Sequence, residues 1–475
     1  MGIGGLGTML LRTHRPVWKS EACLSCGVCT GRCPTRLFSE QALEWDSLRG
    51  RVARADIFPK LPDPPKVPPC QAACPLGQDI PAYVRALARG DGAEAAEVIL
   101  RTNPLPSICG RLCLRACMRT CVRVALDRPV EIRALKRAAA ELTLKRAADG
   151  IQPPKKSGRV VVIGAGPAGL SAAYFLARDG WEVVLMEAEA QPGGLLRFGV
   201  PSFDLAREVL DQEIAALLAY GVELKLNVAI RSRADLKGLF DSGANAVVLA
   251  TGLGQGHKLG IPGELLPGNW DAVSFARSYG EGKGPRLQGS VVVAGGSNMA
   301  VACARMAVRA GASSVTLVSR RSLADTPADG EKLAFAEHEG VRLIQEFRPT
   351  DIIGTKRVQL IRCARVSYGP PDRCARRWPR SVPDAAQEIV ELEAAVFVAA
   401  EDRGTQLSWL AEIEAVEAGP LGNLAIDGDT FMTGRPGVFA AGDVATGPRN
   451  VISAIAMGRQ VAMAVGRFLE RETRS

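Results

Sequence analysis

The chain has 475 residues, too many for a single hydrophobic core, so two or three domains are expected. With 47% apolar and 23% charged residues, it fits a soluble globular protein. The formal net charge of +9 is spread along the chain, with one denser patch at 373–380. This charge is either a solvated basic surface or a face that steers an acidic partner or an anionic nucleotide. Because no basic helix or aromatic-interleaved motif accompanies it, nucleic-acid binding is not expected.

The first residues, MGIGGLGTMLLRTHRP, lack a sustained apolar stretch with a cleavage site, and they lack Ser or Thr at position 6. We therefore expect neither a signal peptide nor myristoylation. The longest uncharged run, 160–177, contains three glycines and a proline, which favours a strand, turn and helix over a membrane span. A cytoplasmic location is expected, and because that compartment keeps thiols reduced, the cysteines are not expected to form structural disulfides.

Four cysteines lie close together in CLSCGVCTGRCP, residues 23–34. Zinc ribbons usually separate two C-x-x-C pairs by a dozen or more residues. The spacing here is C-x-x-C-x-x-C-x-x-x-C-P, in which three closely spaced thiolates bind one iron–sulfur cubane and the fourth reaches another. We predict Cys23, Cys26 and Cys29 as ligands of one 4Fe–4S cluster, with Cys33 reaching a neighbouring one.

Two proline-rich joints follow, at 61–69 and 151–158, and between them apolar residues recur at helical spacing over 80–100 and 128–148. A small helical domain is therefore expected. Its six cysteines are Cys70, Cys74, Cys109, Cys113, Cys117 and Cys121. A spacing of four could mean only a helix interface, but a second ligand group is what the first cysteine run needs. Ten cysteines suffice for two clusters, and a third cluster would need other ligands.

From residue 159 onward, apolar strand-like runs alternate with glycine turns and Ala-rich helical stretches, an α/β pattern. Residues 159–188 read as strand, turn, helix and strand, with the turn GAGPAG at 164–169. Its glycines allow a pyrophosphate to approach a helix N-terminus, whose dipole favours the anion. Glu187 follows at the distance expected for a hydrogen bond to an adenosine ribose. A dinucleotide site is predicted.

Four further stretches together identify this dinucleotide as FAD: QPGGLLRFGVP at 191–201, the entry to a strand at 217–224, AVVLATG at 246–252, and residues 437–462, which begin GVFAAGDVATG. In the last one, Asp443 closes a strand before a helix and is placed to meet the ribityl chain. The candidate FAD contacts are Gly164, Gly166, Pro167, Ala168, Gly169, Glu187, Gly194, Leu195, Arg197, Thr251, Gly252, Gly442 and Asp443.

A second fingerprint lies in residues 290–322, where a glycine pair follows a strand, a helix opens, and the next strand ends in two arginines. Arginines in place of an acid suit a 2′-phosphate, which favours NADP over NAD. A Rossmann-like domain without nucleotide is the alternative. The candidate contacts with NAD(P) are Gly295, Gly296, Asn298, Met299, Arg320 and Arg321.

From about residue 70 to its end, the chain resembles the small-subunit family of NADPH-dependent glutamate synthase. This family includes the N-terminal half of dihydropyrimidine dehydrogenase and the large subunit of the electron-bifurcating ferredoxin:NADP oxidoreductase. The motifs that carry the resemblance are CQAACPLGQDIP, NPLPSICGRLC, VVVIGAGPAGLSAAYFLA, QPGGLLRFGVPSFDLAREVLDQEI, LGIPGELLPG, SRRSLADTPAD and GVFAAGDVATG.

The resemblance implies two Rossmann-like domains, for FAD and NAD(P), preceded by an α-helical iron–sulfur domain; an extra ferredoxin-like segment precedes that. The expected boundaries are 1–60 for that segment, 61–155 for the helical domain, 156–287 and 421–475 for the FAD domain, and 288–420 for the NAD(P) domain. The resemblance also implies Cys70, Cys74, Cys113, Cys117 and Cys121 as cluster ligands. Cys109 falls where relatives can carry a non-ligand.

Three residues depart from the family pattern in the NAD(P) domain. Ser297 replaces a key glycine, Ala302 stands where relatives carry an aspartate, and Glu401 stands where they carry a strand-end glycine. The side chain of Ser297 lies where the backbone would approach phosphate. The departures bear on the pose of the nucleotide and on the choice between NAD and NADP.

The implied function is that of an FAD- and 4Fe–4S-dependent oxidoreductase subunit moving electrons between NAD(P)H and a partner. Expected partners are larger catalytic subunits or a ferredoxin-type subunit, in a 2-oxoacid:acceptor oxidoreductase or a glutamate-synthase-like hetero-oligomer. The alternative is a non-catalytic electron relay with a degenerate nucleotide site. A disulfide reductase is disfavoured, because no two cysteines after Cys121 lie close together in the sequence. Hydride transfer between stacked rings depends on positioning, so no catalytic side chain is nominated.

Overall fold

The computed structural model describes residues 9–12, 15–18, 67–143, 154–256, 258–368, 379–381, 388–401, 403–404 and 423–472. The chain divides into two compact units, each formed from two segments. The first comprises Met1–Thr102 and Arg115–Ala139, and the second comprises Asn103–Leu114 and Ala140–Ser475. Residues 103–114, which we expected within the helical iron–sulfur domain, thus group with the second unit.

The first unit is mainly helical. Its helices are α4 Pro69–Ala72, α5 Ile80–Ala88, α6 Gly92–Leu100, α8 Ala116–Arg119, the 3-10 helix η2 Val122–Ala125 and the first part of α9 Ile132–Thr143. Asp79 caps α5 by accepting from the Ala82 N–H (3.0 Å), and Asp91 caps α6 in the same way. Near the N-terminus, strands β1 Met9–Arg12 and β2 Arg15–Trp18 pair antiparallel.

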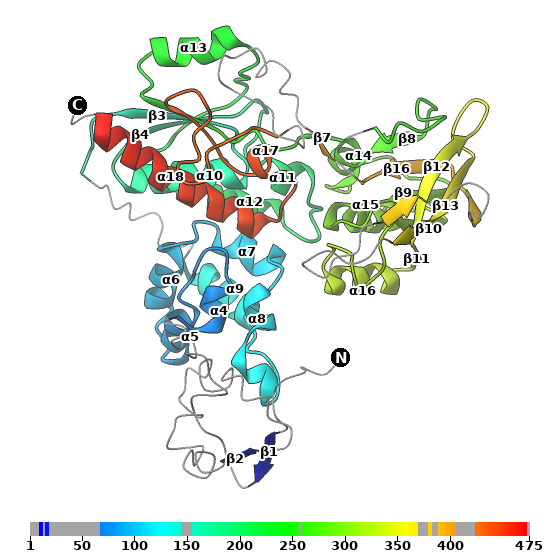
Figure 1. Cartoon of the computed structure of the whole chain (residues 1–475), viewed down its shortest axis with the longest axis horizontal. Helices are drawn as coiled ribbons and strands as arrows, with labels where there is room; N and C mark the ends of the chain where they lie inside the picture. Colours follow the sequence, from blue (N-terminus) through cyan, green and yellow to red (C-terminus); the bar gives the residue numbers. More distant parts are fainter. Residues whose placement is uncertain are drawn as a thin grey trace, which may run out of the picture. The chain divides into compact units, whose positions relative to one another are not determined.

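The second unit contains a five-stranded parallel sheet in the order β18-β6-β3-β4-β5. Its strands are β3 Arg159–Ile163, β4 Glu182–Met186, β5 Glu223–Lys225, β6 Ala246–Leu249 and β18 Val438–Ala440. Strand β18 is contributed by the C-terminal segment. The helix that follows it, α18 Val451–Glu472, packs along α10 Pro167–Arg178 (Figure 1). A Cβ on Gly458 would lie 2.2 Å from the Ala168 carbonyl oxygen, so only glycine permits this approach.

A second parallel sheet has the order β11-β10-β9-β16-β8. Its strands are β8 Asn269–Asp271, β9 Ser290–Ala294, β10 Ser314–Ser319, β11 Val341–Gln345 and β16 Val396–Ala399. Helices α14 Ala272–Tyr279, α15 Asn298–Arg309 and α16 Gly330–His338 pack with it around a core that includes Phe275 and Val293. Strand β8 belongs to this sheet, although its residues fall within the range expected for the FAD domain.

Smaller elements complete the second unit. An antiparallel sheet contains β12 Phe347–Ile353, β13 Leu360–Tyr368, β14 Pro379–Ser381 and β15 Ile389–Glu393, while β7 Gln255–Gly256 pairs with β17 Arg403–Gly404. The remaining helices are α7 Pro106–Leu112, α11 Leu195–Phe198, α12 Arg207–Leu218, α13 Arg233–Asp241 and α17 Asp443–Thr446. Two parallel sheets with covering helices confirm the predicted α/β fold class. Among the described helices, none is both long and apolar enough to cross a membrane.

An ion-pair network links the loop before α12 to the helices of the second parallel sheet. Asp204 accepts from Arg305 Nη1 at 2.9 Å and from Lys332 Nζ at 2.8 Å. The Arg305 guanidinium also binds Glu339 at 2.8 Å and lies over the Phe203 ring. The side chains of Arg305 and Asp204 are only 7% and 14% exposed, so neither charge is well solvated if its partner is lost.

We expect Asp204→Ala to destabilise the second unit by about 3 kcal/mol, because it leaves two cations poorly solvated. The matched control is Asp241→Ala, which removes an exposed i,i+4 pair with Lys237 and should cost about 0.5 kcal/mol or less. Urea unfolding of both variants, followed by flavin fluorescence, measures the difference. Equal effects of the two substitutions would contradict the assignment.

Candidate functional site

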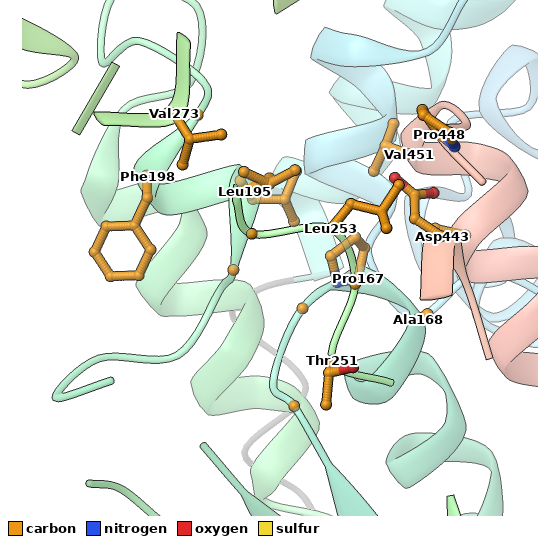
Figure 2. Close-up of a pocket in the computed structure, with 18 of the residues that line it drawn as sticks. Pro167, Ala168, Leu195, Phe198, Thr251, Leu253, Val273, Asp443, Pro448 and Val451 are labelled. Atoms are coloured by element: carbon orange, nitrogen blue, oxygen red, sulfur yellow. The ribbon is translucent and has the colours of Figure 1, made fainter. Parts of the chain in front are cut away.

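The second unit contains a cavity of about 1310 Å³, larger than the 300–1,000 Å³ usual for a drug-sized ligand. Loops at the carboxyl ends of strands in both parallel sheets line it, as expected for nucleotide sites in such sheets. Figure 2 shows part of its lining: Pro167 and Ala168 at the start of α10, Leu195 and Phe198 of α11, Thr251 and Leu253 after β6, Val273 of α14, and Asp443 with Pro448 and Val451 from the C-terminal segment.

The turn between β3 and α10 is built for close backbone approach. Gly164 has φ of +103°, where a side chain would be strained, and its Cβ would lie 2.5 Å from the Ala250 carbonyl oxygen. A Cβ on Gly169 would lie 1.9 Å from the Gly164 carbonyl oxygen. Helix α10 begins at Pro167 with no side-chain cap from Gly166. Its first turn therefore presents backbone N–H groups and the positive end of the helix dipole to the cavity.

Glu187 lies at the end of β4 and is only 8% exposed. Its carboxylate accepts hydrogen bonds from Ala165 N–H at 2.7 Å and Glu189 N–H at 3.0 Å. It therefore braces the glycine turn while it lines the cavity. The uncapped helix end, the glycine turn and this carboxylate fit the pyrophosphate and adenosine ribose of a dinucleotide.

Most of the residues predicted to bind FAD come together here. Those that line the cavity are Gly164, Gly166, Pro167, Ala168, Glu187, Gly194, Leu195, Thr251, Gly252 and Asp443. Three others do not line it. Gly169 and Gly442 allow tight packing, since a Cβ on Gly442 would lie 2.7 Å from the Ala168 Cβ. Arg197 is buried, and its side chain binds the Pro192 carbonyl at 2.7 Å and the Asp211 carboxylate.

Several cavity residues had no signal of their own in the sequence. The loop 228–231 after β5 lines the cavity, but it contains no motif. Phe198 and Val451 lie in or beside the stretches that indicated FAD, so adjacency was their only signal. Leu112 and Leu114 also line the cavity, on either side of the predicted cluster ligand Cys113. Because both leucines are distant in the sequence from the glycine turn, no sequence pattern indicated that they line the same cavity.

Residues of the second fingerprint, 290–322, line two separate cavities. Asn298 and Met299 line the large cavity, together with Ser297 and Ala302. Gly295, Gly296 and Arg321 line a separate small cavity of about 20 Å³. Ser297 caps α15 by accepting from the Ala300 N–H at 3.4 Å. The side chain that replaces the family glycine therefore binds the helix end that would otherwise face a phosphate.

Arg320 leaves β10 and reaches the carboxylate of Glu401, with 3.7 Å between Nη1 and Oε2. Glu401 follows β16 and lines the large cavity. Strands β10 and β16 lie on opposite sides of β9, so the Arg320–Glu401 pair crosses the carboxyl end of β9, which Gly295 follows. Two of the three departures, at 297 and 401, thus place the chain's own polar groups where a nucleotide is expected.

Of the predicted cluster ligands, Cys23, Cys26, Cys29 and Cys33 lie outside the described residues. In the first unit, burial and then the negative charge of Cys121 raise the pKa of the half-buried Cys70, which places these two thiols near each other. Cys74 and Cys117 are buried in the same unit, and Cys113 is buried in the second. In the part of the chain that the structure describes, no three potential ligands are arranged to hold a metal ion.

The remaining described cysteines are buried individually. Cys109 donates to the Asn103 side-chain oxygen at 3.7 Å, which supports its omission from the ligand set. Burial raises the pKa of Cys303, and it raises the pKa of Cys363 to about 12, so both are unreactive thiols. None of the described residues around the large cavity is a cysteine. Among the residues that the structure describes, no pair of cysteines therefore lies beside this site.

Two parallel sheets with glycine turns at their carboxyl ends, sharing one large cavity, define a two-dinucleotide oxidoreductase. The chain belongs to the pyridine nucleotide-disulphide oxidoreductase family, which matches residues 158–458. Residues 65–148 match the family described as dihydropyrimidine dehydrogenase domain II, 4Fe-4S cluster. The two matches confirm FAD, a nicotinamide nucleotide and a 4Fe–4S cluster as cofactors.

The chain is also similar to subunits of known oxidoreductases, which confirms the resemblance drawn from its motifs. It is 35% identical to the beta subunit of the NADP(+)-dependent formate dehydrogenase of Moorella thermoacetica, over 86% of this chain and 60% of the relative. It is 33% identical to the NADPH-Fe(3+) oxidoreductase beta subunit of Geobacter sulfurreducens, over 85% and 64%. It is 32% identical to the glutamate synthase small chain of Halomonas elongata, over 85% of this chain and 88% of the relative. The chain thus spans less than two thirds of the first two relatives.

Solved structures show the same fold. FprA from Mycobacterium tuberculosis in complex with NADPH superposes with a TM-score of 0.54 at 18% sequence identity, over 67% of this chain and 86% of FprA. Thioredoxin reductase from Lactococcus lactis superposes with a TM-score of 0.50 at 22% identity, over 66% of this chain and all of the reductase. At these identities the likeness describes the fold alone.

Proposed function

We propose that this chain is the NAD(P)H-linked electron-transfer subunit of a larger oxidoreductase complex. The observation that carries the proposal is the single cavity lined by both glycine-containing sheets and by the two leucines that flank Cys113. Bound FAD supplies the conversion between a hydride and single electrons. Oxidation of one NAD(P)H releases two electrons and one proton, and bound 4Fe–4S clusters would accept the electrons one at a time.

The protein's residues hold and orient the cofactors. When FAD is bound, the start of α10 and the glycine turn would hold the pyrophosphate, Glu187 would hold the adenosine ribose, and Asp443 would hold the ribityl chain. Asn298 and Met299 are placed to receive the nicotinamide nucleotide. Met299 packs against Gly199, since a Cβ on that glycine would lie 2.7 Å from its terminal methyl group. This contact brings the nucleotide helix beside the flavin side of the cavity.

For the clusters, Cys70, Cys74, Cys113, Cys117 and Cys121 are the proposed ligands, together with Cys23, Cys26, Cys29 and Cys33. The partner is a larger catalytic subunit or a ferredoxin-type subunit in the cytoplasm. A 2-oxoacid:acceptor oxidoreductase or a glutamate-synthase-like complex is proposed, because the ferredoxin-like cysteine run suits wiring through ferredoxin-type subunits. The relatives' names, as subunits of formate dehydrogenase and glutamate synthase, support a complex of this general kind.

A second candidate function is an electron relay that does not react with nucleotide. The Arg320–Glu401 pair and the Ser297 cap favour it, because both place the chain's own groups at the nucleotide end of the second sheet. The two functions differ in one measurable step, which is reduction of the bound flavin by NAD(P)H.

Anaerobic titration of the purified protein with NADH, and separately with NADPH, is expected to bleach the absorbance of the bound flavin. NADPH is expected to be the better donor, because its 2′-phosphate can compete with Glu401 for Arg320. A sample that dithionite reduces, but that neither nucleotide bleaches, would refute the oxidoreductase proposal and support the relay.

A further inference from the structure

The loop between α11 and α12, residues 199–206, lies along the helix that follows the second glycine turn. At its start, Gly199 packs against Met299 in the first turn of α15, since a Cβ on Gly199 would lie 2.7 Å from the terminal methyl group of Met299. At its other end, Asp204 binds Arg305 of the same helix, with 2.9 Å between Oδ1 and Nη1. Met299 and Arg305 are about 9 Å apart along the helix axis. The loop therefore contacts α15 at two separate places.

Asp204 is the centre of a network of ion pairs that water reaches poorly. Its carboxylate also binds Lys332 Nζ at 2.8 Å, so it joins α15 to α16. The Arg305 guanidinium in turn binds Glu339 at the end of α16, at 2.8 Å, and lies over the Phe203 ring, 4.7 Å from its centroid. The Asp204 side chain is only 14% exposed, so salt screens these attractions less than those of surface pairs. The network fixes where the loop lies on both helices.

The same piece of chain is also fastened to the glycine turn predicted for FAD. The Gly193 N–H donates to the Ala165 carbonyl at 2.8 Å. A Cβ on Gly194 would lie 2.9 Å from the Gly166 Cα, so these two backbones touch. Helix α11 starts directly after Gly194 and leads into the loop. Residues 193–204 thus connect the FAD-binding turn with the helix that is placed to receive the nicotinamide nucleotide.

The loop backbone is held by hydrogen bonds of its own. The N–H groups of Asp204 and Leu205 donate to the Pro201 carbonyl at 3.0 and 3.1 Å. The Ser202 N–H donates at 2.8 Å to the carbonyl of Gly280, at the end of α14. Because Pro201 also lines the large cavity, a shift of the loop would move part of the cavity wall.

We propose that Asp204 is a positioning residue for hydride transfer, which holds the nucleotide-binding helix α15 in place relative to the FAD-binding turn. This proposal rests on the proposed function, in which NAD(P)H gives up a hydride whose two electrons reduce the bound flavin. Such a transfer depends on placement, and a displacement of about 1 Å can slow it about a hundredfold. Asp204 itself does not line the cavity. Its loss should therefore change the rate of hydride transfer and not the affinity for the nucleotide.

The test compares Asp204→Asn with wild type, using the full chain reconstituted with its cofactors. Asparagine keeps the size of the side chain and removes its charge. Anaerobic stopped flow at increasing NADPH concentration gives the limiting rate of flavin bleaching, and titration with NADP+ gives the dissociation constant. We expect the limiting rate to fall at least tenfold, while the dissociation constant stays within about twofold of the wild-type value.

Two further variants assign the effect to the contact itself. Arg305→Gln breaks the same ion pair from the helix side and should slow bleaching in the same way. Because both substitutions remove one contact, the double variant should be no slower than the slower single variant. Leu236→Ala is the control for a general loss of stability, since it truncates a fully buried side chain of α13. It should bleach at the wild-type limiting rate.

Hydrogen exchange without nucleotide reports the loop directly. The amides of residues 202, 204 and 205 should exchange at least tenfold faster in Asp204→Asn than in wild type or in Leu236→Ala. This readout does not depend on any reaction with NAD(P)H.

An unchanged limiting rate in Asp204→Asn would overturn the proposal, and so would equal slowing in Leu236→Ala, which indicates a merely structural role. Unchanged exchange of the loop amides would overturn it as well. If Asp204→Asn does not fold, Arg305→Lys replaces it in every measurement, since lysine keeps the cation but cannot join Asp204 to Glu339 as a planar fork does. Failure of both nucleotides to bleach the wild-type flavin would refute the proposed function itself, an outcome distinct from bleaching at one rate in all variants.

Discussion

Gly166→Ala is expected to give a folded protein that has lost most of its affinity for FAD. Gly166 has φ of −77° and ψ of 179°, a conformation that alanine adopts freely. Its added Cβ would meet no protein atom within 4 Å. Because the residue lines the cavity at the start of α10, the new methyl group would stand where the pyrophosphate approaches the helix N-terminus.

We expect the dissociation constant for FAD to rise at least tenfold, which corresponds to about 1.4 kcal/mol. Flavin fluorescence during titration of the deflavinated protein measures it, and the unfolding midpoint without FAD should stay at the wild-type value. Gly238→Ala is the matched control, since its Cβ also meets nothing within 4 Å but lies in α13 away from the cavity. Wild-type affinity in Gly166→Ala would show that the pyrophosphate does not lie at this helix end.

A substitution at Gly169, in the same glycine turn, is expected to affect folding rather than FAD binding. Gly169→Ala would place a Cβ 1.9 Å from the Gly164 carbonyl oxygen, so the helix and strand could not keep their spacing. This variant should lose stability even without FAD, in contrast to Gly166→Ala. The same glycine turn thus contains one position that serves the ligand and one that serves the fold.

Glu401→Ala is expected to lower the KM for NADPH about tenfold. Glu401 holds Arg320 in an ion pair and presents a carboxylate to the cavity, and phosphate groups are repelled by that charge. Its removal takes away the carboxylate that competes with a 2′-phosphate for this guanidinium, and a hydrogen bond to a charged group contributes about 1.5–3 kcal/mol. NADH has no 2′-phosphate, so its KM should change less, and the preference for NADPH should increase.

Steady-state kinetics with both nucleotides and a soluble acceptor measure this change. Arg320→Ala should act in the opposite direction, raising the KM for NADPH while leaving that for NADH nearly unchanged. Glu391→Ala is the control, because it breaks an ion pair with Arg362 on the antiparallel sheet. If Glu401→Ala changed the KM of both nucleotides equally, Glu401 would act only as a general negative charge and not through Arg320.

The cofactor classes could be predicted from the sequence because their recognition is local. A glycine turn between a strand and a helix creates a phosphate site within a few residues, and the acid at the end of the next strand follows at a set distance. Gly164, Gly166 and Glu187 therefore carried the prediction of a dinucleotide site without knowledge of any long-range contact. The helices beginning at Ile80 and Ile132 were equally local, since apolar residues at helical spacing predicted them.

Residues distant in sequence were placed only by tertiary packing. Arg197 was predicted beside FAD because it lies in a flavin stretch, yet its guanidinium packs under Pro192 and binds Asp211. Strand β8 precedes the second fingerprint in sequence but pairs with β16 in the same sheet. The pairing of Arg320 with Glu401 likewise depends on which strand ends become neighbours, which periodicity along one strand does not encode.

The sequence by itself therefore determined the fold class, the two dinucleotide turns and the cysteine-rich iron–sulfur region, because these depend on backbone conformation and ligand spacing over short distances. Only the tertiary structure decided that Glu213 caps α7, that Leu112 and Leu114 border the flavin cavity, and that Glu401 meets Arg320. The first and the last of these contacts join residues about eighty or more positions apart in the sequence, which local patterns do not encode, and the buried Glu213 carboxylate binds α7 because buried polar groups must find partners once the hydrophobic cores have packed.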